Sequence, residues 1–222
     1  MFWTSALVAL MMLVASAGDL KRSKIAALPV VVRVHERIEL PGILVLQAED
    51  NASRIFAGAG LDVRLERAGR SRPKQKAHYI DLTICDTSEG YYAGALGLAR
   101  PFRPGGNQVE ILYPRVRPII ERREAYAGRI LGHVFAHEIA HVLTQIPDHS
   151  SEGLMKAKWD SDDFRKMAVE YLPFDARDIA AMRSTVMGWT NDNLADEKDT
   201  EQRPAVADCA VLLSSPRTCS GF

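Results

Sequence analysis

The sequence predicts an α+β domain in which a small twisted mixed sheet lies against one long helix, with further helices towards the C-terminus. Two observations carry this prediction. Runs that are rich in β-branched residues or alternate in polarity indicate strands, at residues 28–34, 61–66, 78–85 and 109–113. Apolar residues also recur at helical spacing in two long stretches, from Leu44 to Ala59 and from Glu121 to His141.

Length and composition fit one ordinary globular domain. The chain has 222 residues, of which 47% are hydrophobic and 25% are charged. Its 28 basic and 28 acidic residues cancel, whereas nucleic-acid-binding domains are typically basic. We therefore expect no nucleic-acid partner, and we expect a monomer.

The N-terminus predicts export from the cytoplasm. Residues 2–17 (FWTSALVALMMLVASA) are almost all apolar or small, and they end in an A-x-A pattern. This is typical of a cleaved signal peptide over residues 1–17, followed by a connector over residues 18–27. The run is shorter than the roughly 20 apolar residues of a membrane span. We expect a secreted or periplasmic protein without a stable membrane span; an uncleaved N-terminal anchor is the alternative.

The first half of the domain combines three strands with one helix. Residues 28–34 (LPVVVRV) are typical of a buried strand. Pro41 opens the helix that comes next, and Gly60 ends it. Residues 61–66 (LDVRLE) alternate strictly and therefore predict a half-exposed strand, and residues 78–85 (HYIDLTIC) predict the third strand.

The second half begins with a glycine-rich stretch. Within it, Ala95–Ala99 indicates a short edge strand, and the last strand, at 109–113, ends at Pro114. After the long helix, Ser161-Asp162-Asp163 is typical of a helix start and leads into residues 164–171. Asp175 then opens a further helix over residues 176–187.

The C-terminal stretch differs in composition from the rest. Residues 189–222 begin with a charged, polar run that has no apolar stripe, so we expect a mobile tail after a domain that spans residues 28–188. Cys209 and Cys219 lie close together there, and an oxidising compartment would allow a disulfide between them. The third cysteine, Cys85, ends a strand pattern and is expected to be a buried thiol.

The long helix carries the motif His137-Glu138-Ile139-Ala140-His141. Residues four apart share one helix face, so both imidazoles can reach a single metal ion. Glu138 lies beside them, where a carboxylate base would be needed for hydrolysis. Pro147 ends the helix soon afterwards, and His149 offers a third ligand in the loop. Zinc in catalytic sites takes three protein ligands and a water molecule.

Other readings of these residues remain open. A buried amphipathic helix with incidental histidines is one, although burying such groups unpaired is costly. His133 lies four residues before His137, so that pair could also bind a metal, although the glutamate-containing motif favours His137 with His141. Asp148 could replace His149 as the third ligand, although imidazole is the better partner for zinc.

The motif and the loop after it resemble the metzincin clan of zinc peptidases. The residues that carry the resemblance are His137-Glu138-x-x-His141, His149-Ser150-Ser151 and Gly153-Leu154-Met155. The pattern is most similar to matrix metalloproteases, and comparable runs occur in uncharacterised secreted bacterial zincin-like proteins. The expected order of strands and helices is also similar to that of the clan's N-terminal subdomain, so the resemblance covers roughly residues 28–187.

The resemblance implies a zincin-like catalytic domain over residues 28–188. It implies that Zn²⁺ is held by His137, His141 and His149, and that Glu138 is the catalytic general base. Met155 would lie under the metal as an apolar floor, although an ordinary core methionine would be buried as well.

The sequence departs from the clan pattern after the helix. Thr144 stands where the clan has glycine, and Pro147 stands where the clan has its third ligand. His149 lies two residues further on, so the turn over residues 145–148 must absorb the extra length. Because a residue other than glycine disfavours a left-handed backbone, we expect a turn of different shape.

Together these features predict a secreted zinc-dependent endopeptidase. It would hydrolyse peptide bonds of a protein or peptide substrate with a zinc-activated water and Glu138 as general base. The alternative is a zincin-fold protein that binds zinc but is catalytically inactive, since a fold does not fix an activity. The presence of Glu138 favours the enzyme, because zinc binding alone needs no general base. A metal-free structural domain is the remaining reading.

Overall fold

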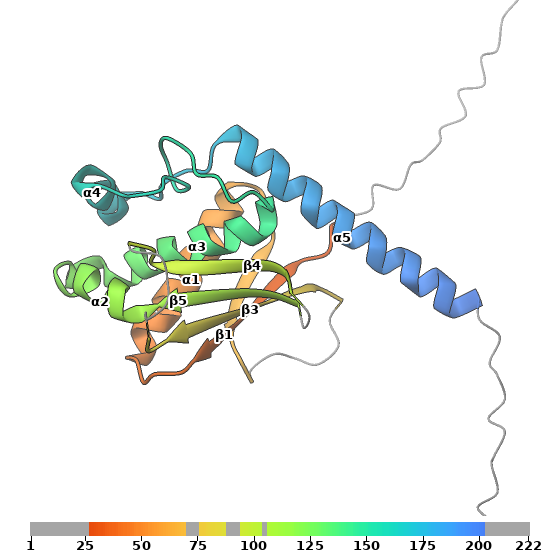
Figure 1. Ribbon diagram of the computed structural model, residues 1–222, viewed down its shortest axis with the longest axis horizontal. Helices are drawn as coiled ribbons and strands as arrows, with labels where there is room; N and C mark the ends of the chain where they lie inside the picture. Colours follow the sequence, from red (N-terminus) through yellow and green to blue (C-terminus); the bar gives the residue numbers. More distant parts are fainter. Residues whose placement is uncertain (1–26, 70–75, 88–93, 104–105, 203–222) are drawn as a thin grey trace, which may run out of the picture.

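The computed structural model describes residues 27–69, 76–87, 94–103 and 106–202 (Figure 1). The elements occur in this order: β1 (Val30–Glu36), α1 (Gly42–Gly58), β2 (Val63–Arg67), β3 (His78–Cys85), β4 (Gly97–Arg103), β5 (Gly106–Leu112), α2 (Tyr113–Glu121), the short 3₁₀ helix η1 (Glu124–Tyr126), α3 (Ala127–Thr144), α4 (Ser161–Val169) and α5 (Ala176–Gln202). The predicted α+β class is confirmed, and β3 has the predicted bounds.

The five strands form one mixed sheet in the order β2-β1-β3-β5-β4. β1 pairs in parallel with β2 and β3, and β3 pairs in parallel with β5. β4 runs antiparallel to β5 and lies at the edge of the sheet, as expected for the short strand predicted at Ala95–Ala99. Parallel neighbours require crossover connections, which α1 provides between β1 and β2.

The side chains of the central strands alternate between a buried and a more polar face. Val32 and Leu82, which face the helices, are fully buried. On the other face, Arg33 and Asp81 form an ion pair whose closest atoms, Nη2 and Oδ2, lie 2.6 Å apart. This alternation is the period-two pattern from which the strands were predicted.

Helices α1 and α3 pack closely against each other behind the sheet (Figure 1). Two glycines of α3 permit this approach: a Cβ atom at Gly128 would lie 2.5 Å from Gln47 Cβ, and one at Gly132 would lie 2.7 Å from Asn51 Cβ. Nearly every residue of α3 is buried, so this helix is the centre of the core.

The helix predicted from Glu121 to His141 is wrong at its start. The structure has α2, η1 and then α3 in this part of the chain, and α2 was not predicted. Its two prolines are the reason. Pro114 lies in the first turn, where the missing N–H is harmless, but Pro118 lies inside the helix, where proline is normally disfavoured. The helix start predicted at Ser161-Asp162-Asp163 is confirmed, since α4 begins at Ser161, where Asp160 caps it by accepting the N–H groups of Asp162 and Asp163; the helix ends at Val169.

Helix α5 is longer than the predicted 176–187 and extends to Gln202, beyond the rest of the domain (Figure 1). The boundary expected at residues 188/189 therefore lies within a helix. The expected signal peptide, Cys209 and Cys219 lie outside the described residues, whereas Cys85 is a buried free thiol, as predicted. Among the helices that the structure describes, none is both long and apolar enough to cross a membrane.

Candidate metal centre

Helix α3 presents His137 and His141 on one face, one turn apart. The helix ends at Thr144, and Gln145 then adopts a left-handed backbone with φ 58° and ψ 22°. Its N–H donates to the carbonyl of His141 at 3.0 Å, which satisfies one of the last free carbonyls of the helix. Thr144, which stands where the clan has glycine, is still helical, and the left-handed conformation falls one residue later, on Gln145, although that residue is not glycine.

Backbone carbonyls orient both imidazoles. His137 Nδ1 donates to the Leu154 carbonyl at 2.8 Å, and His141 Nδ1 donates to the Ile146 carbonyl at 3.0 Å. A carbonyl can only accept, so each Nδ1 carries the hydrogen and each Nε2 presents a lone pair. These two Nε2 atoms lie 3.3 Å apart.

Two facing lone pairs at this distance repel each other unless a cation lies between them. A proton is disfavoured there, because burial lowers the pKa of His137 to about 4 and also lowers the pKa of His141. Two nitrogens that each lie about 2.0–2.1 Å from a tetrahedral zinc are separated by about 3.4 Å. The pair therefore fits zinc, and the carbonyl contacts are those that orient metal-bound histidines.

His149 joins the pair from the loop after α3. The ligand nitrogens of His137, His141 and His149 all lie within 4.8 Å of one another. Its ring stacks on His137, with centroids 5.3 Å apart, and meets His141 edge-on at 4.9 Å. Asp148, the rival third ligand, is exposed and does not belong to this group. The structure thus brings together the three histidines that the sequence indicated.

His133 does not share this site, although it lies on the same helix face as His137. Its Nδ1 donates to the Arg129 carbonyl at 2.7 Å, and its Nε2 accepts the N–H of Leu172 at 3.1 Å. Both ring nitrogens are occupied, so His133 has no lone pair left for a metal. Its role is to attach the segment around Leu172 to α3.

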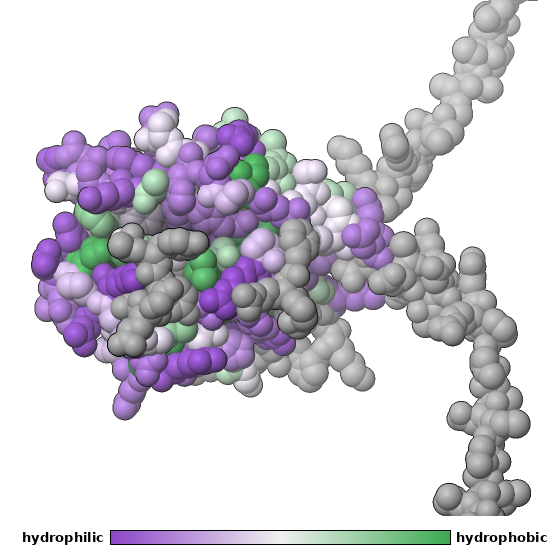
Figure 2. Space-filling view, in the orientation of Figure 1, coloured by the Kyte–Doolittle hydropathy of each residue, from purple (hydrophilic) through white to green (hydrophobic). Residues whose placement is uncertain are grey.

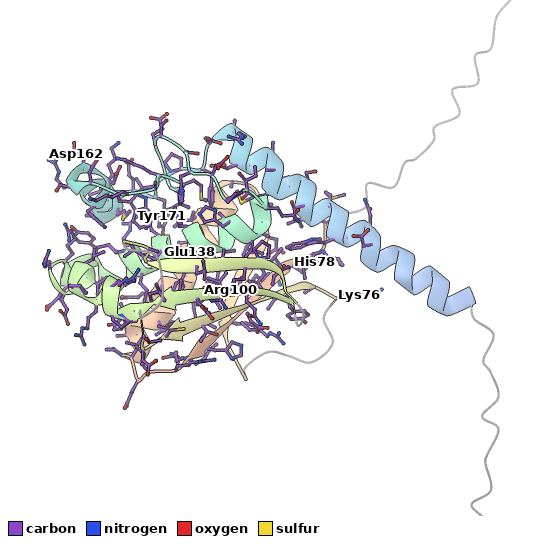
Figure 3. All side chains as sticks on the ribbon, in the orientation of Figure 1. Lys76, His78, Arg100, Glu138, Asp162 and Tyr171 are labelled. Carbon is purple, nitrogen blue, oxygen red and sulfur yellow. The ribbon has the colours of Figure 1, made fainter. Side chains whose placement is uncertain are left out.

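Glu138 lies where α3 passes the edge strand β4 (Figure 3). Its side chain has no hydrogen-bond partner among the described residues, and burial raises its pKa to about 8. A cation held by the histidines would oppose this shift by favouring the carboxylate. Gly97 makes room for the side chain, because a Cβ atom there would lie 2.6 Å from Glu138 Cγ and 2.8 Å from the Glu110 carbonyl oxygen.

A cleft of about 1110 Å³ opens over the histidines and Glu138. Its walls are strand β4 on one side and, on the other, the loop over residues 156–159 with Phe164 of α4. Figure 2 shows apolar surface (green) in the band between the α4 region and the strands below it. Its volume is close to the upper end of the roughly 300–1,000 Å³ of typical ligand pockets, so a substrate has room to reach the histidines.

Two residues at the site were missed from the sequence. Trp159 donates its indole N–H to the Leu154 carbonyl at 3.2 Å, the same oxygen that accepts from His137. Its ring also meets that of His137 edge-on, with centroids 5.5 Å apart. Neither Trp159 nor Gly97 stands at a spacing that a motif defines, so no sequence signal could have found them. Met155 is 2% exposed, as both readings of it predicted.

No family model matches the chain, and no curated protein matches it. Among solved structures, archaemetzincin from Methanopyrus kandleri is similar over 74% of this chain and 99% of its own length, with 16% sequence identity and a TM-score of 0.43. A match at this TM-score does not establish a shared fold, so the function proposed for this chain rests on its own geometry.

Proposed function

We propose that the chain is a zinc-dependent endopeptidase that acts outside the cytoplasm. The observation that carries the proposal is the convergence of three imidazoles, with ligand nitrogens within 4.8 Å of one another, beside the buried carboxyl group of Glu138. A purely structural zinc site has four protein ligands and no need of a base, whereas three ligands with a neighbouring carboxylate suit hydrolysis.

When bound, zinc would polarise the carbonyl of the substrate and lower the pKa of a water molecule. Glu138 would take a proton from the attacking water on its carboxylate and later give it to the leaving nitrogen. The apolar surroundings that raise its pKa also make it a good proton carrier, because a base that is too weakly basic would hold the proton poorly. His137 and His141 stay neutral because burial lowers the pKa of each ring, and their Nδ1–H bonds to carbonyls leave each Nε2 lone pair free for the metal.

The edge of β4 provides a site for an extended substrate. Leu112 N–H donates to the Leu96 carbonyl at 2.9 Å, so in this antiparallel register residues 96, 98 and 100 direct their backbone groups to β5. The backbone groups of Gly97 and Ala99 then point away from β5, and both residues line the cleft. A peptide strand could pair with them and lie across the histidines.

Side-chain preference would come from the apolar wall of the cleft. Ile119, Val134, Trp159 and Phe164 line it, and Arg123 stacks its guanidinium over the ring of Phe164 at 4.3 Å from the centroid. We expect a substrate with a bulky apolar residue next to the cleaved bond. We also expect a monomeric enzyme with a protein or peptide as its partner.

The test is to compare the wild type with Glu138→Gln in a peptide-library cleavage assay and in a zinc titration. Gln keeps the size of the side chain but cannot accept the proton, so cleavage should fall at least about 100-fold while zinc is still bound. Glu152→Gln, which changes an exposed glutamate of the nearby loop, is the matched control and should cleave like the wild type.

A Glu138→Gln variant that cleaves as fast as the wild type would overturn this role for Glu138. A wild type that binds zinc but cleaves no peptide of the library would instead favour the catalytically inactive zinc-binding protein. A hydroxamate or a chelator should block any cleavage that depends on the metal.

A further inference from the structure

The third ligand differs from the other two in its support. The rings of His137 and His141 each donate to a backbone carbonyl, but the ring of His149 has no hydrogen bond among the described residues. It is also the most exposed of the three. The position of His149 at the metal must therefore be fixed by the backbone of the loop. This loop is two residues longer than the corresponding segment of the metzincin pattern.

Ser150, the next residue, is where the loop is attached. Its N–H donates to the Met155 carbonyl at 2.8 Å, and it forms an isolated parallel bridge with Lys156. Its hydroxyl Oγ lies 3.0 Å from Asp175 Oδ2 and 3.3 Å from Asp178 Oδ2. One residue thus joins the loop both to the turn at Met155 and to the start of α5.

The two carboxylates are themselves held in place. Asp175 begins α5 by accepting the N–H of Asp178 on Oδ1 at 2.7 Å, and Asp178 is 8% exposed. Helix α5 is anchored in the core by Met182, and Arg183 donates to the Ala59 carbonyl at 2.8 Å. The clamp on Ser150 therefore comes from the start of a helix that is anchored in the core.

A second contact supports the same attachment. Leu154 N–H donates to the Pro173 carbonyl at 2.9 Å, and Leu172 N–H donates to His133 on α3. Gly153 has φ 73° and no room for a side chain, because a Cβ atom there would lie 2.5 Å from the Pro173 carbonyl oxygen. The segment over residues 172–175 thus bridges α3 and the metal loop.

We propose that the Ser150 hydroxyl, held by the carboxylates of Asp175 and Asp178, is the positioning group that places His149 at the metal. The proposal rests on the metal site of the proposed function, but not on peptide hydrolysis. Ser150 touches neither metal nor substrate; it acts through His149 alone. Substituting a group that orients a metal ligand without touching the metal typically lowers metal affinity by about 10- to 100-fold.

The test is a double-mutant cycle on the full chain, read as zinc affinity by competition with a chromogenic chelator. Ser150→Ala should weaken zinc binding about tenfold in the wild type. In the His149→Ala background the same change should have less than about a twofold effect, because the ligand that it positions is gone. Ser150→Thr keeps the hydroxyl and should recover most of the affinity.

Controls separate this role from a general loss of structure. Ser151→Ala changes the exposed neighbouring serine and should leave zinc affinity within about twofold. Asp178→Asn changes the carboxylate of α5 that contacts Ser150 and leaves the sequence of the loop unchanged. It should weaken zinc binding in the wild type, and much less in the His149→Ala background, as Ser150→Ala does. Thermal melts in chelator would show whether each variant is folded without zinc.

Two results would overturn the clamp. In the first, Ser150→Ala binds zinc as tightly as the wild type while His149→Ala binds it more weakly. His149 would then be a ligand that does not need the Ser150 hydroxyl. In the second, Ser150→Ala weakens binding equally with and without His149. If His149→Ala itself leaves zinc affinity unchanged, the third ligand is wrong and the clamp falls with it.

Discussion

Helix α3 and the loop over residues 145–156 supply the same centre in different ways. The helix is almost entirely buried, and it offers two histidines whose rings are oriented by carbonyls. The loop offers one histidine, His149, which is exposed and whose ring has no hydrogen bond among the described residues. Substitutions on the core side of the helix should therefore act mainly on the stability of the fold, and substitutions around His149 in the loop mainly on metal affinity.

The largest expected effect comes from the core side of α3. Phe135 is fully buried, and Phe135→Ala should lower the free energy of unfolding by about 3–5 kcal/mol, because it removes apolar contacts and leaves a cavity. Urea unfolding in the presence of a chelator measures this without the metal. Ser151→Ala in the exposed loop should change it by less than about 0.5 kcal/mol. Similar losses for both variants would remove the distinction between the two regions.

Gly97 tests how tightly the helix is fitted to its neighbours. Gly97→Ala would push β4 and the Glu138 side chain apart, and a displacement of about 1 Å at a catalytic group can lower a rate about 100-fold. We expect peptide cleavage to fall by at least about tenfold while zinc affinity is kept. Gly58→Ala, where a Cβ atom has nothing within 4 Å, is the matched control and should cleave normally. Unchanged cleavage by Gly97→Ala would show that this contact yields easily.

The smallest effect belongs to the turn between helix and loop. Gln145 holds a left-handed backbone that costs a residue with a side chain about 1 kcal/mol. Gln145→Gly should therefore raise the free energy of unfolding by up to about 0.5–1 kcal/mol. Ser184→Gly, at an exposed helical position of α5, should lower it by about 0.5 kcal/mol. If thermal melts showed that both glycine variants are stabilised, or that both are destabilised, this account of the turn would be contradicted.

The same contrast explains what the sequence could predict. The strands and most of α3 follow from local patterns of apolar residues, and His137, Glu138 and His141 follow from the spacing of one helical turn. The choice of His149 over Asp148 needed the structure, because a loop has no fixed period that places its side chains. The partners of Ser150 lie 25 and 28 residues further along the chain, a distance that no local pattern bridges.

The predictions of α2 and α5 were wrong for different reasons. Helix α2 was not predicted because it contains Pro118, and proline is normally disfavoured inside a helix. Helix α5 continues past residue 187 without an apolar stripe, because a helix that leaves the surface of the domain has no core to face.

The central claim is that His137, His141 and His149 bind one zinc ion. The most direct measurement is zinc stoichiometry and affinity for the wild type, His149→Ala and Asp148→Ala. The account predicts one tightly bound zinc per chain in the wild type, the same affinity in Asp148→Ala, and a loss of about 100-fold or more in His149→Ala, since removing a ligand should exceed the effect of removing its support. A wild type that binds no zinc, or an Asp148→Ala variant that loses it while His149→Ala keeps it, would contradict the claim.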